Sequence, residues 1–146
     1  MEGMAVLAQP ECRHLARQRE GLQKVHAALA REGMALQVLG CPRLPAQARA
    51  AVGQRVVAVA VRVIDGERAA DTVRGPLADG ELLDMGTQAP QAQAGPLQRV
   101  SAESLAQPAE DALSPDVLYN RDWLRKRMQE QGLRAVDDAW WAFAAP

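Results

Sequence analysis

The sequence is poor in the side chains that bind metal ions. Its 146 residues include only two histidines and two cysteines, and aromatic residues make up 3% of the chain. His14 and His26 are twelve residues apart on one predicted helix, or roughly 18 Å along its axis, so they are too far apart to share a metal ion. Two cysteines cannot form a disulfide framework for a chain of this size. Cys12 and Cys41 are therefore predicted to be buried or free thiols in a reducing compartment.

The chain also lacks a large net charge and a long apolar run. Its formal net charge of −1 creates no field that would recruit nucleic acid or anionic lipid, so no nucleic-acid partner is expected. No segment approaches the roughly 18 consecutive apolar residues of a membrane span. The acidic Glu2 and the few apolar residues before Pro10 are unlike a secretory signal peptide. We therefore expect a cytoplasmic or otherwise intracellular protein.

What the chain does contain is the composition of one globular domain. Apolar residues make up 48% of it and charged residues 24%, so residues 1–146 are predicted to form a single domain with a substantial core. An amphipathic helix is expected over residues 11–33, with Gly33 ending it. Its apolar stripe consists of Leu15, Leu22, Val25, Leu29 and Ala30.

Alternating and β-branched segments predict a sheet. Residues 55–65 give the strongest strand pattern, with the small Ala58 and Ala60 on one face and valines on the other. This pattern is typical of a central strand that is covered on both sides. Weaker patterns predict strands at 35–40 and 81–85, and a short helix at 46–52 after regular structure is broken by Pro42 and Pro45.

The last third of the chain begins with a segment of low complexity. Residues 88–112 are rich in Gln, Ala, Pro, Gly and Ser, which predicts a long loop or a disordered insert. A helix then begins at Ser114 as its N-cap, turns Leu118, Leu124 and Met128 inward, and closes at Gly132. One or two strands follow. The order of elements predicts an α+β domain with a small, mostly antiparallel central sheet flanked by helices.

Five segments in this order resemble the zinc D-alanyl-D-alanine dipeptidases of the vancomycin-resistance type. The most specific are Gly80–Thr87, close to the family's G-x-x-x-D-M-G-T hairpin, and Ala139–Phe143, similar to its terminal E-W-W-H-F strand. Residues 36–49 are similar to the family's strand, Y-R-P turn and R-A-Q helix. Residues 58–63 take the place of A-x-D-x-T-L, and 120–132 follow N-R-x-L-L…M…G-F. The resemblance implies a single dipeptidase domain of the DD-carboxypeptidase (hedgehog) type.

The resemblance also implies that the zinc site is lost. The family binds zinc with two histidines and an aspartate, and a glutamate moves the proton. When the two patterns are aligned on Ala58, the ligand positions hold Gly53, Ala60 and Ala142, and Ala139 replaces the glutamate. None of these residues can bind a metal ion or carry a proton. The expectation is a chain with no metal, no cofactor and no catalytic residue, and therefore not an enzyme.

Arg43 is the one catalytic-type residue that the resemblance retains, at the place of the family's oxyanion arginine. It is either a vestigial ligand-binding residue for a carboxylate or carbonyl group, or a turn arginine that pairs with a nearby acid. Trp140 and Trp141 are interpreted as structural, because adjacent strand residues face opposite sides. The cluster of cations on the last helix is interpreted as a solvated face, diluted by acids.

Together these interpretations predict a catalytically inactive, dipeptidase-like protein that acts as a structural or binding subunit in a larger assembly. Its expected partners are other protein subunits. Two alternatives stay open. One is a residual or metal-independent peptidase that uses Cys41, two residues from Arg43. The other is a protein that binds a small ligand in the vestigial pocket near Arg43, whose ligand the sequence does not identify.

Overall fold

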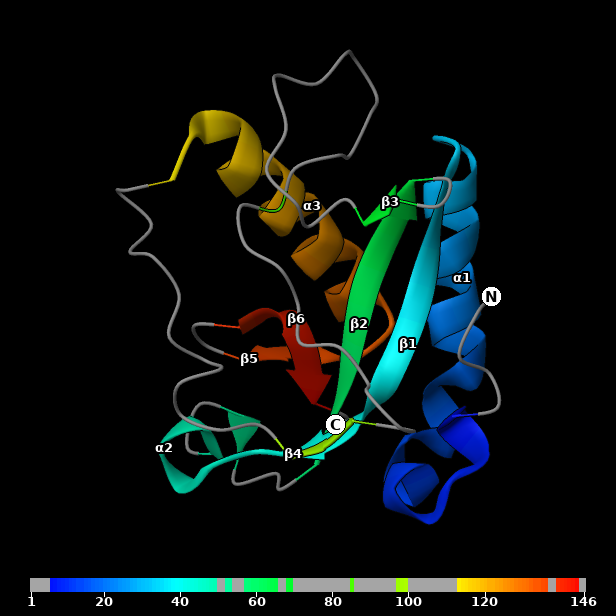
Figure 1. Ribbon diagram of the computed structural model, residues 1–146, viewed down its shortest axis with the longest axis vertical. Helices are drawn as coiled ribbons and strands as arrows, with labels where there is room; N and C mark the ends of the chain where they lie inside the picture. Colours follow the sequence, from blue (N-terminus) through cyan, green and yellow to red (C-terminus); the bar gives the residue numbers. More distant parts are fainter. Residues whose placement is uncertain are drawn as a thin grey trace.

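One mixed sheet organises the computed structural model, which describes residues 6–49, 52–53, 57–65, 68–69, 85, 97–99, 113–136 and 139–144 (Figure 1). The elements in chain order are the 3₁₀ helices η1 (Val6–Ala8) and η2 (Pro10–Gln18), α1 (Arg19–Ala30), β1 (Met34–Arg43), α2 (Ala46–Arg49), β2 (Ala58–Asp65), β3 (Arg68–Ala69), β4 (Leu97–Arg99), α3 (Pro115–Glu130), β5 (Arg134–Val136) and β6 (Ala139–Ala144). The predicted α+β class is confirmed.

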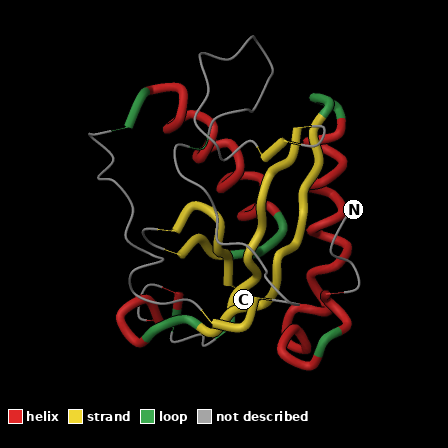
Figure 2. The backbone as a smooth tube through the Cα atoms, viewed as in Figure 1, coloured by secondary structure: helices red, strands yellow, loops and turns green. Residues whose placement is uncertain are grey.

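The sheet is mostly antiparallel, as predicted. Its strand order is β4-β1-β2-β6-β5, and β3 pairs with β2 outside this path. All neighbours are antiparallel except β4, which runs parallel to β1. Figure 2 shows the strands as one group with the long helices beside it. Helix α1 packs against β1, and α3 packs against β5 and β6. The central position of β2 explains why Ala58, Val59, Ala60 and Val61, which alternate between its two faces, are all fully buried.

The first helical segment differs from the single helix predicted over residues 11–33. It begins as the 3₁₀ helix η2 and becomes α-helical only at Arg19. Leu15, Leu22, Val25 and Leu29 are buried as predicted, but Ala30 is exposed. Ala30 ends α1, one residue and about 100° of rotation beyond Leu29, so it turns away from the core. The helix ends before Gly33, whose φ of 77° is the left-handed value typical of glycine after a helix.

Strand β1 is longer than predicted, because it continues through Pro42 to Arg43. The prediction that Pro42 interrupts regular structure was therefore wrong. β1 contains a bulge at which Val38 pairs with Val61 but Gly40 pairs with Ala60, so Leu39 and Gly40 both oppose one residue. Proline, which has no N–H to donate, is tolerated beside a bulge near the end of a strand.

The C-terminal elements follow the sequence pattern closely. The Ser114 hydroxyl accepts a hydrogen bond from the N–H of Val117 at 3.3 Å and caps α3. Leu124 and Met128 are buried as predicted, whereas Leu118 is only half-buried. The strands predicted after this helix are β5 and β6. No described helix is both long enough and apolar enough to cross a membrane.

Two predicted segments fall mainly outside the described residues. Of the strand expected at 81–85, only Met85 is described, and it is buried and belongs to no strand. Of the loop or insert expected at 88–112, Leu97–Arg99 is described and forms β4. The short helix expected at 46–52 is present as α2, and residues 50 and 51 are not described.

Candidate functional site

The sheet register brings together two of the positions to which the sequence resemblance assigns zinc ligands. Ala60 on β2 and Ala142 on β6 are direct cross-strand partners, and Ala58 and Ala144 form the next pair on the same face. Directly opposite residues in an antiparallel pair have Cβ atoms about 4.5–5.5 Å apart. We call the surface formed by these four residues the alanine face. Larger side chains at positions 60 and 142 would therefore meet.

The opposite side of the sheet carries the large core side chains. Val59 pairs with Phe143, and alternation along the two strands places Val61, Val63 and Trp141 on the same side. We call this side the valine face. Each of these five side chains is at most 1% exposed. Trp140, on the alanine face, is 9% exposed, so both tryptophans belong to the core and face opposite sides as predicted.

The third position to which the resemblance assigns a zinc ligand, Gly53, lies near the tip of the Arg134 side chain. A Cβ atom at Gly53 would be 3.3 Å from Nη1 of Arg134, and Arg134 pairs with Ala144 across β5 and β6. The φ of Gly53 is 68°, a left-handed conformation that residues with a side chain rarely adopt. A histidine at this position would be strained in the present backbone.

The four residues that define the alanine face offer only methyl groups. Ala58, Ala60, Ala142 and Ala144 are fully buried, and Ala139, at the place of the family's glutamate, is 2% exposed. Methyl groups neither coordinate metal ions nor transfer protons. Within the described ranges, no three His, Cys, Asp or Glu side chains gather into a group that could hold a metal ion.

Arg43 is placed away from the alanine face. It forms an isolated bridge with Val57, and counting along β2 from Val57 places Arg43 on the same side as Val59. Its side chain is exposed, and among the described residues it makes no ion pair or side-chain hydrogen bond. Besides the bridge with Val57, the backbone of Arg43 pairs with that of Arg99 in β4. The register thus separates Arg43 from Ala60 and Ala142.

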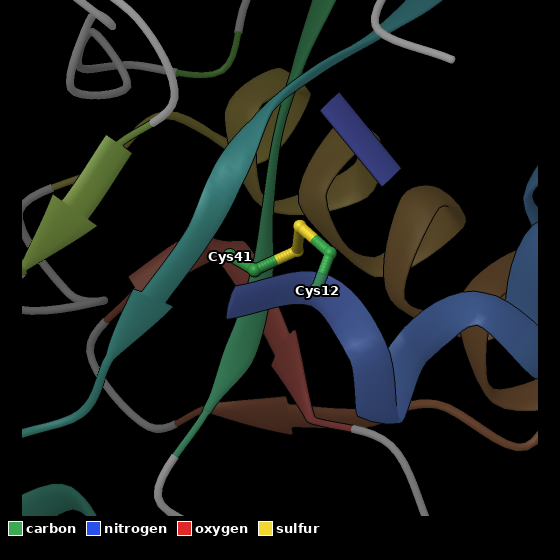
Figure 3. The surroundings of a disulfide bond; sticks show 2 residues. All are labelled: Cys12 and Cys41. Carbon is green, nitrogen blue, oxygen red and sulfur yellow. A yellow bond between two sulfur atoms is a disulfide. The ribbon is translucent and has the colours of Figure 1, made fainter. Parts of the chain in front are cut away.

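The two cysteines form a disulfide, which contradicts the prediction of free or buried thiols. Cys12 of η2 and Cys41 of β1 have Cα atoms 5.3 Å apart, and Figure 3 shows their joined sulfurs between the two elements. The bulge in β1 is what directs Cys41 to η2. In a regular strand, Cys41 would pair with Ala58 and lie on the alanine face, whereas the extra residue places it on the valine face. Sequence spacing alone could not reveal this shift.

His26 makes a polar contact that the sequence did not predict. Its Nδ1 accepts a hydrogen bond of 3.1 Å from the backbone N–H of Leu36. Because this N–H donates to His26, the bond pairs a donor on the edge of β1 away from β2 with α1. Burial lowers the pKa of His26 from its ordinary value of 6.5, which favours the neutral imidazole that can accept this bond.

Two of the family-like motifs touch each other. Nε of Arg121, in the segment that resembles N-R-x-L-L, donates a hydrogen bond of 2.6 Å to the carbonyl oxygen of Met85, in the segment that resembles D-M-G-T. Met85 is fully buried. The bond therefore ties residue 85 to α3 across 36 residues of chain.

The other cations of α3 form a largely solvated face, as interpreted from the sequence. Arg125 and Lys126 are exposed and both pair with Asp122, the Lys126 contact being 2.9 Å. The hydrogen bond from Lys126, followed by that from Arg125, lowers the pKa of the Asp122 carboxyl. Arg127 lies over the ring of Trp123, 5.3 Å from its centroid, and pairs with Glu130. These contacts are internal to the helix.

Comparison with protein-family models gives no match, and comparisons with curated proteins and with solved structures likewise give none. The likeness to the dipeptidases therefore depends on the five sequence segments.

Proposed function

We propose that this chain is a catalytically inactive relative of the zinc D-alanyl-D-alanine dipeptidases that serves as a structural or binding subunit for other proteins. The observation that carries the proposal is the direct pairing of Ala60 with Ala142. The alignment with the dipeptidases assigns an aspartate and a histidine to these two positions. Two ligands of one zinc ion must converge, and positions 60 and 142 are neighbours on one face of the sheet.

The substitutions remove each chemical group that hydrolysis by this family requires. Without an imidazole or carboxylate at positions 60 and 142, no ion is held to lower the pKa of a bound water or polarise a carbonyl group. Ala139 cannot shuttle the proton. Buried alanines also avoid the cost of burying unpaired polar groups, so the core is stabilised by the same changes that remove catalysis.

The contact between Arg121 and Met85 supports the dipeptidase-like fold. It joins two segments whose sequences resemble motifs of the same family, although the segments are far apart in the chain. The two alternative functions receive less support. Cys41 is in a disulfide, so a metal-independent peptidase would lack its thiolate nucleophile. Arg43 faces away from the alanine face, so it does not favour a ligand pocket there.

The direct test measures zinc and activity together. The purified chain is incubated with zinc, dialysed and analysed for metal by mass spectrometry, and then assayed with D-Ala-D-Ala. We expect substoichiometric zinc and no turnover above the background without protein. One zinc ion per chain with dipeptide hydrolysis would contradict the proposal.

A gain-of-ligand series tests the alignment itself. Ala60→Asp and Ala142→His are made singly and together, and zinc affinity is measured by competition with a chromophoric chelator. Since the two positions pair across the strands, only the double variant should gain affinity over the wild type, by about tenfold or more. The single variants are the matched controls, and circular dichroism verifies that each variant is folded. Equal affinity in the single and double variants would show that these positions do not converge on one ion.

A further inference from the structure

The disulfide joins the least regular helical segment of the chain to the sheet. Cys12 lies within η2, a 3₁₀ helix of nine residues, and Cys41 lies in β1 directly after the bulge. A 3₁₀ helix of this length is unusual, because its hydrogen bonds have poorer geometry than those of an α-helix. Helix hydrogen bonds alone are therefore a weak basis for holding η2 against the sheet.

Besides the disulfide, the packing of a few apolar side chains holds η1 and η2 against the core. Leu15 of η2 and Leu7 of η1 are buried in the main core. Arg13 and Arg17 of the same helix are exposed. The two cysteines are separated by 29 positions in the sequence, and the chain between them includes all of α1. A covalent bond that closes a loop of this length restricts the unfolded chain and favours the folded state.

Both sulfur atoms are inaccessible in the folded chain. Cys12 and Cys41 have no exposed surface and belong to the hydrophobic core. Thiol–disulfide exchange requires a thiolate to approach one sulfur along the S–S axis, which burial prevents. Redox-active cysteines are partly exposed, in contrast to this pair. The burial is that of a structural disulfide.

We infer that this chain matures in an oxidising compartment, where formation of the Cys12–Cys41 bond locks η2 onto the sheet. This inference replaces the intracellular, reducing location expected from the sequence. It is independent of the proposed function, because neither cysteine belongs to the alanine face. Disulfides persist in compartments that are oxidising and are rare where thiol reductants keep cysteines reduced.

The bond forms by exchange with a disulfide-bearing oxidant while η2 is still open. The thiolate of one cysteine attacks a sulfur of the oxidant, giving a mixed disulfide and releasing one thiolate of the oxidant. The second cysteine thiolate then attacks the mixed disulfide, which forms the Cys12–Cys41 bond and releases the other thiolate of the oxidant. Overall, two electrons and two protons pass from the two cysteines to the oxidant. Closure of η2 afterwards buries the product.

The first experiment compares the same full chain with and without export to the bacterial periplasm. Acid trapping, alkylation and intact mass count the free thiols in each sample. We expect no free thiols in the exported chain and two in the cytosolic chain. Two free thiols in the folded, exported chain would overturn the inference.

The second experiment asks whether the bond holds η2. The oxidised and reduced wild-type chains are digested briefly with trypsin, and the fragments are identified by mass. Reduction should raise the rate of cleavage after Arg13 and Arg17 at least severalfold and lower Tm by roughly 10 °C. Equal Tm and equal cleavage at these two sites in the two forms would overturn the inference.

A double variant separates the covalent bond from the packing of the sulfur atoms. In the Cys12→Ala/Cys41→Ala variant, reductant should have no effect on Tm or on cleavage, whereas the wild type should respond to it. If this variant does not fold, reduction kinetics of the wild type give the answer. Reduction by dithiothreitol should be on the order of 100-fold slower in native buffer than in denaturant. Equal rates in the two conditions would show that the sulfurs are not protected by the fold.

Discussion

At the scale of single residues, the side chains that matter most here are those whose partners lie far away in sequence. The alanine pair at positions 60 and 142 could be anticipated, because two motifs suggested which residues replace zinc ligands. Their direct pairing could not, since strand register is a tertiary property. His26 shows the same limit. A histidine on a predicted helix carries no signal that its ring accepts a hydrogen bond from a strand edge.

His26 should make stability depend on pH. Burial lowers its pKa in the folded state below the unfolded value near 6.5, so the unfolded chain binds more protons. Its stabilising contribution is therefore complete above pH 6.5 and is lost as the pH falls through the folded pKa. We expect His26→Ala to lower the free energy of unfolding by about 1–2 kcal/mol at pH 8, because the N–H of Leu36 loses its acceptor.

The control for this prediction is His26→Asn, whose Oδ1 can occupy the place of Nδ1 but does not titrate. Urea unfolding at pH values between about 5 and 8, which bracket the ordinary pKa of histidine, gives the comparison. The difference in stability between wild type and His26→Asn should shrink or reverse as the pH falls. A constant difference across this range would refute the role of His26.

Two arginines provide a matched pair of substitutions. Nε of Arg121 binds the carbonyl oxygen of buried Met85, so Arg121→Ala should cost about 1.5–3 kcal/mol. Arg43 is exposed and has no side-chain partner among the described residues, so Arg43→Ala should change stability by less than about 0.5 kcal/mol. Chemical denaturation of both variants tests the contrast. A larger loss at Arg43 than at Arg121 would contradict it.

At the scale of elements, local sequence signals located most helices and strands but not their exact form. Serine before proline correctly placed the start of α3, and the β-branched run correctly identified β2 as a central strand. The 3₁₀ form of η2 and the continuation of β1 through Pro42 were not predicted. Cys12 of η2 is bonded to Cys41, and β1 contains a bulge beside Pro42; local periodicity contains neither feature.

The cap of α3 gives a local test of element stability. Ser114→Ala removes the acceptor for the N–H of Val117 and should lower the free energy of unfolding by about 1 kcal/mol. Ser114→Asp keeps a capping oxygen and adds a charge that favours the N-terminus of a helix, so it should retain most of the stability. Thermal and urea unfolding measure both. If both variants lose equally, the cap is not the cause.

The contact between α1 and α3 depends on a missing side chain. A Cβ atom at Gly21 would lie 2.9 Å from Cβ of Gln131, which is too close for two carbon atoms. Alanine is favoured over glycine in a helix by about 1 kcal/mol, yet the clash should make Gly21→Ala neutral or destabilising by about 1–2 kcal/mol. Combining it with Gln131→Gly should restore the gain. Stabilisation by Gly21→Ala alone would show that the helices can separate without cost.

At the scale of the whole molecule, one sheet separates two environments of different chemistry. The valine face holds Val59, Val61, Val63, Trp141, Phe143 and the disulfide to η2, while the alanine face holds two of the positions to which the proposed alignment with the dipeptidases assigns zinc ligands. The α+β class and the mostly antiparallel sheet could be predicted, because they follow from the order of the elements. The disulfide could not, because two cysteines 29 residues apart reveal their proximity only after β1 has been folded and its faces assigned.

The bulge in β1 also means that this strand carries one spare residue. Leu39 and Gly40 share Ala60 as their partner, and the pairs on either side are already aligned with β2. Deletion of Leu39 would remove the bulge and leave Cys41 on the side of Cys12, although the buried leucine side chain would be lost. Removing a residue between Met34 and Val38 would instead force part of the strand to slide or turn over. The tolerance of β1 to shortening is thus concentrated at a single point.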